Sequence, residues 1–274
     1  MKTVILAGGL GTRLSEETDV RPKPMVEVGD YPLLWHIMKI YAHHDHREFL
    51  VALGYKGEYI KRFFLDYSNT GGSLAVDLST GRVERIDDGR QDWRVHLIET
   101  GVHTNTGGRL KRLQPFLGSD TFMVTYGDGV GNIDITALIA FHRRQGRIAT
   151  ISAVRPPARF GGIVFDGDLV ACFSEKPQVG EGWINGGFMV LEPEIFDYLE
   201  GDTDGLEHDV LERLAGEGQL AAFRHEDFWQ CADTLRDVRL LRDLWNSNQA
   251  PWKIWDRSRH ARSLKGSKDT VLCR

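Results

Sequence analysis

The sequence has few cysteines, no long apolar run and little excess charge. Its three cysteines, Cys172, Cys231 and Cys273, are odd in number and far apart, which does not fit a disulfide framework or a cysteine-based metal site. Every apolar run is shorter than the roughly 20 residues that a membrane-spanning helix needs. The net charge of −5 argues against a nucleic-acid partner held by phosphate contacts. We therefore expect a cytoplasmic protein whose partners are neither membranes nor nucleic acids.

The first half of the chain alternates short apolar runs with amphipathic segments, which is typical of strands and helices taking turns. Strands are predicted at Thr3–Ala7, Phe49–Leu53, Val95–Glu99, Phe122–Tyr126 and Ala149–Val154. Helices are predicted between them, at Pro32–Ala42, Glu58–Tyr67, Gly108–Phe116 and Ile135–Arg144. This order predicts an α/β fold with a doubly wound, mostly parallel sheet, whose ligand lies beyond the carboxyl ends of the strands.

The second half is richer in strands. They are predicted at Gly161–Phe165, Leu169–Glu175, Gly186–Leu191 and Leu220–Arg224, with helices at Leu206–Ala215 and Asp233–Trp245. The polar segment Ser68–Trp93 indicates an excursion from the sheet, and the basic residues 256–274 indicate a mobile tail. The sequence thus predicts one domain over residues 1–255.

A glycine-rich loop follows the first predicted strand, from Leu6 to Leu14. Its glycines allow the backbone to approach a phosphate and to turn N–H groups toward it, and Arg13 can grip phosphate oxygens in a bidentate manner. Leu14 stands where a dinucleotide-binding fingerprint needs its third glycine, and no Gly-Lys-Ser/Thr follows for a P-loop. A purely structural glycine turn is the simpler alternative.

A second cation, Lys23, is flanked by Pro22 and Pro24. The two prolines fix the backbone around one ammonium, which suits a lysine held against a chain of phosphates. Alone, this segment is more typical of a turn. Behind the glycine loop, it indicates a second phosphate-binding group.

Two aspartates are candidate magnesium ligands, since magnesium takes one or two carboxylates and leaves its other positions to water and phosphate. Asp128 lies between two glycines at the end of a predicted strand, where a carboxylate can reach a ligand in the crevice. Its alternative role is a turn residue. Asp233 precedes an apolar-periodic helix, so its alternative role is an N-cap.

Two later segments contain side chains suited to a sugar phosphate. Lys176 could bind the phosphate of an acceptor, while Glu175 and Asn185 could hydrogen-bond sugar hydroxyls. On their own, these segments would be a surface turn and the start of a strand. Their order behind the glycine loop and the aspartate motif favours a binding role.

Together these segments resemble the sugar-1-phosphate nucleotidyltransferases, and more closely the bacterial glucose-1-phosphate cytidylyltransferases. The resemblance covers nearly all of Met1–Trp255. The most specific matching segments are Gly8–Thr18, Pro22–Met25, Leu34–Met38, Gly54–Gly57, Thr106–Arg112, Tyr126–Gly129, Glu175–Pro177, Ile184–Phe188, Asp233–Asp237 and Ala250–Lys253. The resemblance implies a Rossmann-like core with a strand-rich sugar-binding portion and a C-terminal helical extension. It also implies a homo-oligomer that uses Mg²⁺ to make CDP-glucose and pyrophosphate from CTP and α-D-glucose 1-phosphate.

The resemblance also implies a role for each matching residue. Arg13, Lys23 and Lys176 would be catalytic, and Asp128 and Asp233 would hold magnesium. The nucleotide would be bound by Leu6, Gly8, Gly9, Gly11, Thr12, Arg13, Lys23, Gly107, Gly108, Arg109 and Asp128. The sugar phosphate would be bound by Tyr126, Gly127, Glu175, Lys176, Asn185 and Gly186.

The sequence departs from the family pattern at two places. Cys231-Ala232 replaces a Pro-Met pair before the second aspartate, and the segment from Glu207 to Leu211 lacks the Glu-Pro of the family's sugar-side helix. These changes leave open another sugar 1-phosphate or another nucleoside triphosphate. A regulatory protein that binds nucleotide without turnover is a further alternative.

Overall fold

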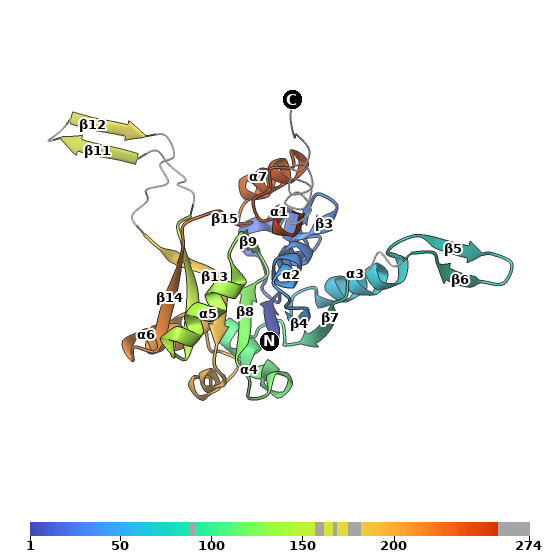
Figure 1. The fold of residues 1–274 in the computed structure, drawn as a ribbon, viewed down its shortest axis with the longest axis horizontal. Coiled ribbons are helices and arrows are strands. Elements are labelled where there is room, and N and C mark those ends of the chain that lie inside the picture. The colour runs from blue at the N-terminus through green and yellow to red at the C-terminus, as the bar shows by residue number, and fades with distance from the viewer. Residues whose placement is uncertain (88–90, 157–161, 167–168, 175–181, 257–274) are drawn as a thin grey trace, which may run out of the picture.

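The computed structural model describes residues 1–87, 91–156, 162–166, 169–174 and 182–256. Its centre is a seven-stranded sheet in the order β14-β10-β13-β8-β1-β4-β7 (Figure 1). In that order the strands are Leu220–His225, Ala149–Val154, Ile184–Leu191, Phe122–Tyr126, Thr3–Leu6, Glu48–Leu53 and Arg94–Glu99. Neighbours are parallel except that β13 runs antiparallel to β10 and β8. The predicted mostly parallel α/β sheet is therefore confirmed.

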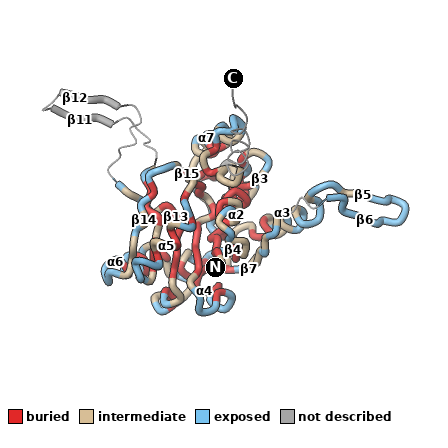
Figure 2. Tube along the Cα trace, in the orientation of Figure 1, coloured by how far each residue is buried: buried red, intermediate tan, exposed pale blue. Residues whose placement is uncertain are grey.

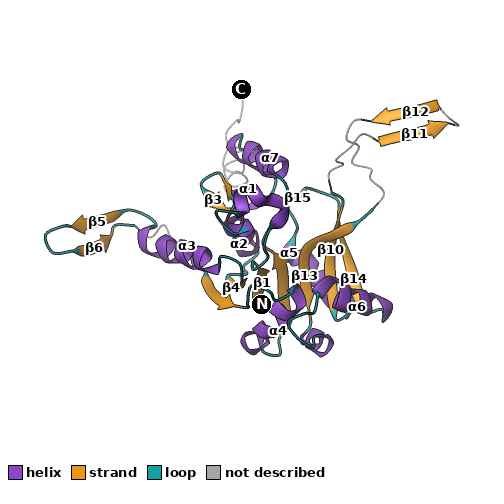
Figure 3. Ribbon diagram, turned by 180° about the vertical axis from the view of Figure 1, so that it is seen from behind, coloured by secondary structure: helices purple, strands orange, loops and turns teal. Residues whose placement is uncertain are grey.

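Successive side chains of each strand point to opposite faces of the sheet, and helices bury both faces. Ile5 of β1 packs on one face with helices α2 (Leu33–His43), α3 (Gly57–Thr70), α5 (Ile135–Gln145) and α7 (Leu235–Asn246). Val4 and Leu6 pack on the other face with α4 (Thr106–Leu117), α6 (Glu212–Gly216), the 3-10 helix η3 (Pro193–Tyr198) and the π-helix η4 (Leu206–Leu211). Helices thus cover the sheet from two sides, as a doubly wound fold requires (Figure 3).

Short elements complete the chain. They are η1 (Thr12–Leu14), α1 (Ser15–Thr18), η2 (Lys23–Met25), β2 (Glu27–Val28), β3 (Tyr31–Pro32), β9 (Gly129–Gly131), β15 (Trp229–Cys231) and η5 (Ile254–Asp256). Strands β11 (Gly162–Asp166) and β12 (Leu169–Ser174) pair with each other. Strands β5 (Leu74–Asp77) and β6 (Arg82–Arg85) form a largely exposed hairpin that projects from the body, within the predicted excursion Ser68–Trp93 (Figures 1 and 2). Residues 257–274, in the predicted tail, lie outside the described residues.

Two predicted helices differ from those observed. The helix expected at Asp233 begins at Leu235, because Thr234 is its N-cap. The Thr234 hydroxyl accepts a hydrogen bond from the Asp237 N–H, and the Asp237 carboxylate accepts one from the Thr234 N–H. The helix expected at Leu206–Ala215 is instead the π-helix η4 followed by the short α6. An apolar pattern of this kind fits α- and π-helical turns almost equally, so it could not distinguish them.

Candidate active site

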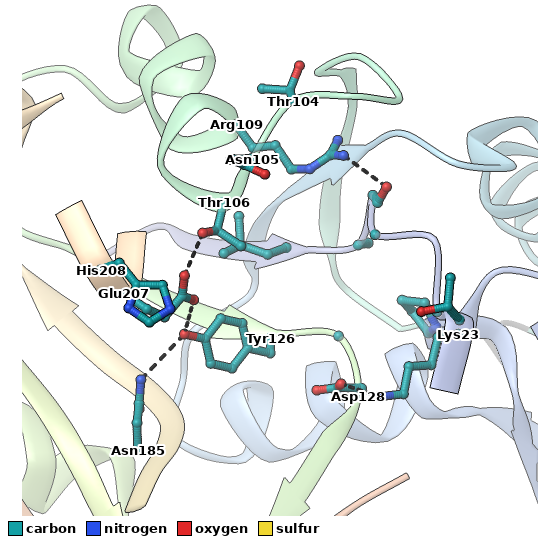
Figure 4. A pocket seen from close by; sticks show the side chains of 18 residues that line it. Lys23, Thr104, Asn105, Thr106, Arg109, Tyr126, Asp128, Asn185, Glu207 and His208 are labelled. Atoms are coloured by element: carbon teal, nitrogen blue, oxygen red, sulfur yellow. Dashed lines mark hydrogen bonds and ion pairs between the residues drawn. The ribbon is translucent and has the colours of Figure 1, made fainter. Parts of the chain in front are cut away.

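A cavity of about 670 Å³ opens at the carboxyl ends of β1 and β8 (Figure 4). That is where a doubly wound sheet places its ligand. Residues predicted to bind nucleotide or sugar phosphate make up much of its wall: Leu6, Gly8, Gly9, Gly11, Thr12, Lys23, Arg109, Tyr126, Gly127, Asp128 and Asn185. No binding role is predicted from the sequence for five further polar wall residues, Thr104, Asn105, Thr106, Glu207 and His208.

The glycine loop lies directly against a buried arginine. A Cβ on Gly8 would lie 2.1 Å from the Arg109 guanidinium, so a side chain there would displace Arg109. Gly11 adopts a left-handed φ of +66°, which also favours glycine. Gly9 is exposed, with open space on the side where a Cβ would point. The loop is therefore closely packed at Gly8, while at Gly9 its backbone is open to a ligand.

Arg109 hydrogen-bonds both to the glycine loop and to the residues that follow β7. Its guanidinium donates to the Gly8 carbonyl at 2.9 Å, to the Thr100 hydroxyl at 2.8 Å and to the Gly101 carbonyl at 2.7 Å. Burial, followed by the nearby charge of Arg112, lowers the pKa of Arg109 from its usual value. These contacts fix the shape of the glycine loop, and contact with the nucleotide stays a prediction.

The other predicted nucleotide-binding glycines pack inside the protein. A Cβ on Gly107 would lie 2.8 Å from the Asp204 carbonyl oxygen, and one on Gly108 would lie 2.7 Å from that of Asp202. Both glycines let α4 approach the chain before η4 closely. Neither forms part of the cavity wall, which contains their neighbours Thr106 and Arg109.

Lys23 brings the two predicted metal ligands together. Its ammonium lies 2.5 Å from Asp128 Oδ2 and also donates to Asp233 Oδ1, although these carboxylates are 105 and 210 positions away in the sequence. Burial by itself would lower the pKa of Lys23, but the charges and hydrogen bonds of Asp128 and Asp233 outweigh it and raise that pKa. One buried cation thus contacts both carboxylates at the edge of the cavity.

Backbone pairing explains why the two aspartates converge. Strand β9, which follows Asp128, pairs antiparallel with β15, which precedes Asp233. The Ala232 N–H donates to the Asp128 carbonyl at 2.8 Å. Because Thr234 caps α7, the alternative role of Asp233 as N-cap is wrong. Its carboxylate faces Lys23 instead.

A polar network occupies the opposite wall of the cavity (Figure 4). The Tyr126 hydroxyl donates to Glu207, and the Asn185 amide donates to Tyr126 at 3.4 Å. The second carboxylate oxygen of Glu207 accepts from the Thr106 hydroxyl at 2.7 Å. Burial and then the Glu207 charge raise the pKa of Tyr126. The Tyr126 phenol is therefore protonated near pH 7.

Comparison with known proteins identifies the family. Residues 2–250 match the family model described as nucleotidyl transferase. The chain belongs to the nucleotidyl transferase family. It is 47% identical over 257 residues to a glucose-1-phosphate cytidylyltransferase of Salmonella typhi, covering 93% of this chain and all of that one. It is 43% identical over 256 residues to a probable glucose-1-phosphate cytidylyltransferase of Bacillus subtilis, with the same coverage.

Solved structures share the nucleotidyl transferase fold. HddC from Yersinia pseudotuberculosis superposes with a TM-score of 0.65 at 24% identity, over 89% of this chain and 99% of that one. UDP-glucose pyrophosphorylase in complex with UDP-glucose superposes with a TM-score of 0.64 at 14% identity, over 90% and 98%. The predicted fold class and the family resemblance are therefore confirmed.

Among the described residues, no helix has both the length and the apolar character to cross a membrane.

The roles of all the predicted site residues of this nucleotidyl transferase stay predictions. Glu175 and Lys176 lie outside the described residues, and for Arg13 only the backbone, within η1, is described. Gly186 is described but packs away from the wall. Its carbonyl accepts a hydrogen bond from the Trp229 indole at 2.8 Å, and a Cβ there would lie 2.5 Å from Val154.

Proposed function

We propose that this nucleotidyl transferase is an enzyme that joins CTP to α-D-glucose 1-phosphate, forming CDP-glucose and releasing pyrophosphate. The near full-length identity of 43–47% to glucose-1-phosphate cytidylyltransferases supports this assignment. The geometric observation that carries it is the convergence of Lys23, Asp128 and Asp233 beside a glycine loop. This arrangement places a lysine cation and a pair of carboxylates next to a backbone that phosphates can approach.

We further propose that Asp128 and Asp233 hold Mg²⁺. The donor set fits this ion, because magnesium prefers oxygen ligands and needs only one or two carboxylates when phosphates supply the rest. The described residues contain no cluster of three or more potential metal ligands. When bound, the ion would neutralise charge on the phosphate oxygens.

The proposed reaction is an in-line displacement at the α-phosphorus of CTP. A phosphate oxygen of glucose 1-phosphate forms the new P–O bond, and the bond to the β-phosphate oxygen breaks to release pyrophosphate. A phosphate monoester has its second pKa at about 6, so the nucleophile is already anionic near pH 7 and no general base is assigned. The chain's contribution is to position two anions and to stabilise charge.

Individual residues have distinct proposed roles in this reaction. Lys23 and Arg13 would stabilise the pyrophosphate, and Lys176 would orient the attacking phosphate. The glycine loop would bind phosphate oxygens through its N–H groups. Asn185 would contact the sugar.

We also propose that the enzyme is a cytoplasmic homo-oligomer. The β5–β6 hairpin and the residues that border it expose Val76, Leu78, Val83 and Ile86, whose exposed fractions lie between 53% and 91%. A hairpin with an apolar surface is marginally stable by itself in water, so contact with another subunit would stabilise it. Light scattering after size exclusion should give a mass of at least twice the 31.0 kDa of one chain.

The proposed reaction is tested by measuring pyrophosphate release with four nucleoside triphosphates and a panel of sugar 1-phosphates. CTP with glucose 1-phosphate should give the highest kcat/KM, and ³¹P NMR should identify CDP-glucose. Activity with UTP or dTTP but not CTP would contradict the choice of base. Nucleotide binding without turnover on any acceptor would instead favour the regulatory alternative.

A further inference from the structure

The network of Glu207, Tyr126 and Asn185 connects η4 to the proposed sugar side of the cavity. Tyr126 ends β8, Asn185 lies near the start of β13, and Glu207 lies in the first turn of η4. All three side chains line the cavity and are half-buried. Glu207 is 81 positions from Tyr126 in the sequence, so only the fold brings them together.

The direction of each hydrogen bond follows from the chemistry of the groups. A carboxylate only accepts, so Tyr126 must donate its single hydroxyl hydrogen to Glu207. The phenol oxygen can then only accept on its other side, where the Asn185 amide donates to it at 3.4 Å. A carboxylate acceptor makes the first bond charge-assisted, and it polarises the second.

The Glu207 carboxylate is itself held in place. Its second oxygen accepts from the Thr106 hydroxyl at 2.7 Å. The Thr106 oxygen in turn accepts from the Leu206 N–H at 2.9 Å, which directs the hydroxyl hydrogen toward Glu207. The start of α4 and the first turn of η4 are therefore joined through this carboxylate.

Asn185 is oriented from its other end as well. Its side-chain oxygen accepts from the Gly187 N–H at 2.9 Å, which fixes which end of the amide faces Tyr126. Gly187 has φ +79°, and a Cβ there would lie 2.5 Å from the Tyr126 ring. The Asn185 amide carries two hydrogens, and Tyr126 accepts one. Among the described residues no acceptor is found for the other, and Asn185 lines the cavity.

We propose that Glu207 is a positioning residue that acts through Tyr126 to aim the Asn185 amide at a hydroxyl of the sugar phosphate. This inference rests on the proposed function, because it assigns the Asn185 side of the cavity to the sugar. Glu207 does not touch the reacting phosphates in this scheme. It sets sugar affinity and sugar discrimination, while CTP binding depends on the glycine loop.

The test replaces Glu207 with glutamine, which has the same size but presents one acceptor and one donor. At least one of the two hydroxyls that now donate to Glu207 must then turn away. We expect E207Q to raise the KM for glucose 1-phosphate roughly tenfold, equivalent to about 1.4 kcal/mol. The KM of E207Q for CTP should stay within about twofold of the wild-type value. The ratio of its kcat/KM for glucose 1-phosphate to that for galactose 1-phosphate should be smaller than in the wild type.

Two further variants separate positioning from general damage to the fold. Y126F removes the link itself, so the double variant Y126F/E207Q should show no larger KM for glucose 1-phosphate than Y126F alone. E217Q is a matched control, because Glu217 accepts from the Tyr198 hydroxyl at 2.6 Å on the exposed surface. It should leave both KM values and kcat unchanged.

The outcomes distinguish this inference from the proposed function. Wild-type protein that forms no CDP-glucose refutes the proposed function. Wild-type protein that forms it, while E207Q keeps the wild-type KM for glucose 1-phosphate, refutes only the role of Glu207. Equal increases in the KM for both substrates, or additive effects in the double variant, would also overturn that role, since both indicate a structural defect.

Discussion

Replacing Lys23 with methionine should destabilise the fold, because two carboxylates then face each other without their cation. The Lys23, Asp128 and Asp233 side chains are 11%, 30% and 15% exposed. An exposed ion pair contributes about 0–1 kcal/mol, whereas removing one partner of a buried pair costs about 3–5 kcal/mol. Partial exposure places Lys23→Met between these limits, at about 2 kcal/mol. In a domain of this size that lowers Tm by roughly 4–8 °C.

Magnesium should reverse much of this loss. In Lys23→Met the two carboxylates keep their charges and become a better site for a divalent cation, and binding to the folded state raises its stability. In the wild type the ammonium already contacts both carboxylates, so Mg²⁺ without nucleotide should shift Tm much less. Differential scanning calorimetry in EDTA and in Mg²⁺ measures both effects.

A matched control separates this effect from the loss of any lysine ion pair. Lys61 pairs with Glu99 at 2.5 Å, and these side chains are 40% and 57% exposed. Lys61→Met should therefore cost at most about 1 kcal/mol and should not respond to Mg²⁺. Equal responses of the wild type and Lys23→Met to Mg²⁺ would refute the reasoning, as would a Tm of Lys23→Met at the wild-type value.

Three other predictions concern residues around this centre. Burial lowers the pKa of His36 to about 4. The unfolded chain therefore binds more protons at His36 between that value and about 6.5, so His36 alone should lower stability by about 2 kcal/mol from pH 7 to pH 5 in urea titrations, and His36→Gln should remove that part of the loss. Burial also lowers the pKa of His46 to about 4, which adds to the loss in both proteins. Thr234→Ala removes the cap of α7 and should cost about 1 kcal/mol by urea denaturation; an unchanged midpoint would contradict that role. Gly8→Ala should displace Arg109 and lower the free energy of unfolding by about 1–3 kcal/mol, and titration calorimetry should show weaker CTP binding. Gly201→Ala, whose Cβ would meet open space, should change neither stability nor CTP binding.

Local sequence signals were sufficient for much of the sheet and for part of the site. Apolar runs ending in glycine marked β1 and β8, and they placed Gly8, Gly11 and Asp128 at the carboxyl ends of strands, where the cavity opens. These features depend on residues close together in the chain, so periodicity and turn chemistry reveal them.

Features that depend on distant contacts could not be predicted in this way. The contact of Asp233 with Lys23 spans 210 positions, so no local pattern shows it. The choice of Thr234 over Asp233 as N-cap is instead local, because the carboxylate of Asp237, three residues further on, accepts from the Thr234 N–H. The wall residue Glu207 has no local signal, because its partners Tyr126 and Thr106 lie 81 and 101 positions away. A site built from such contacts becomes visible only once the chain has folded.

The most direct test of the central claim is pyrophosphate release by Asp233→Asn with CTP and glucose 1-phosphate. Asparagine keeps the size of the side chain that contacts Lys23 but removes its charge. If Lys23, Asp128 and Asp233 form the reaction centre, kcat should fall by about a hundredfold or more while the Tm shows a folded protein. Turnover within threefold of the wild type would contradict the claim.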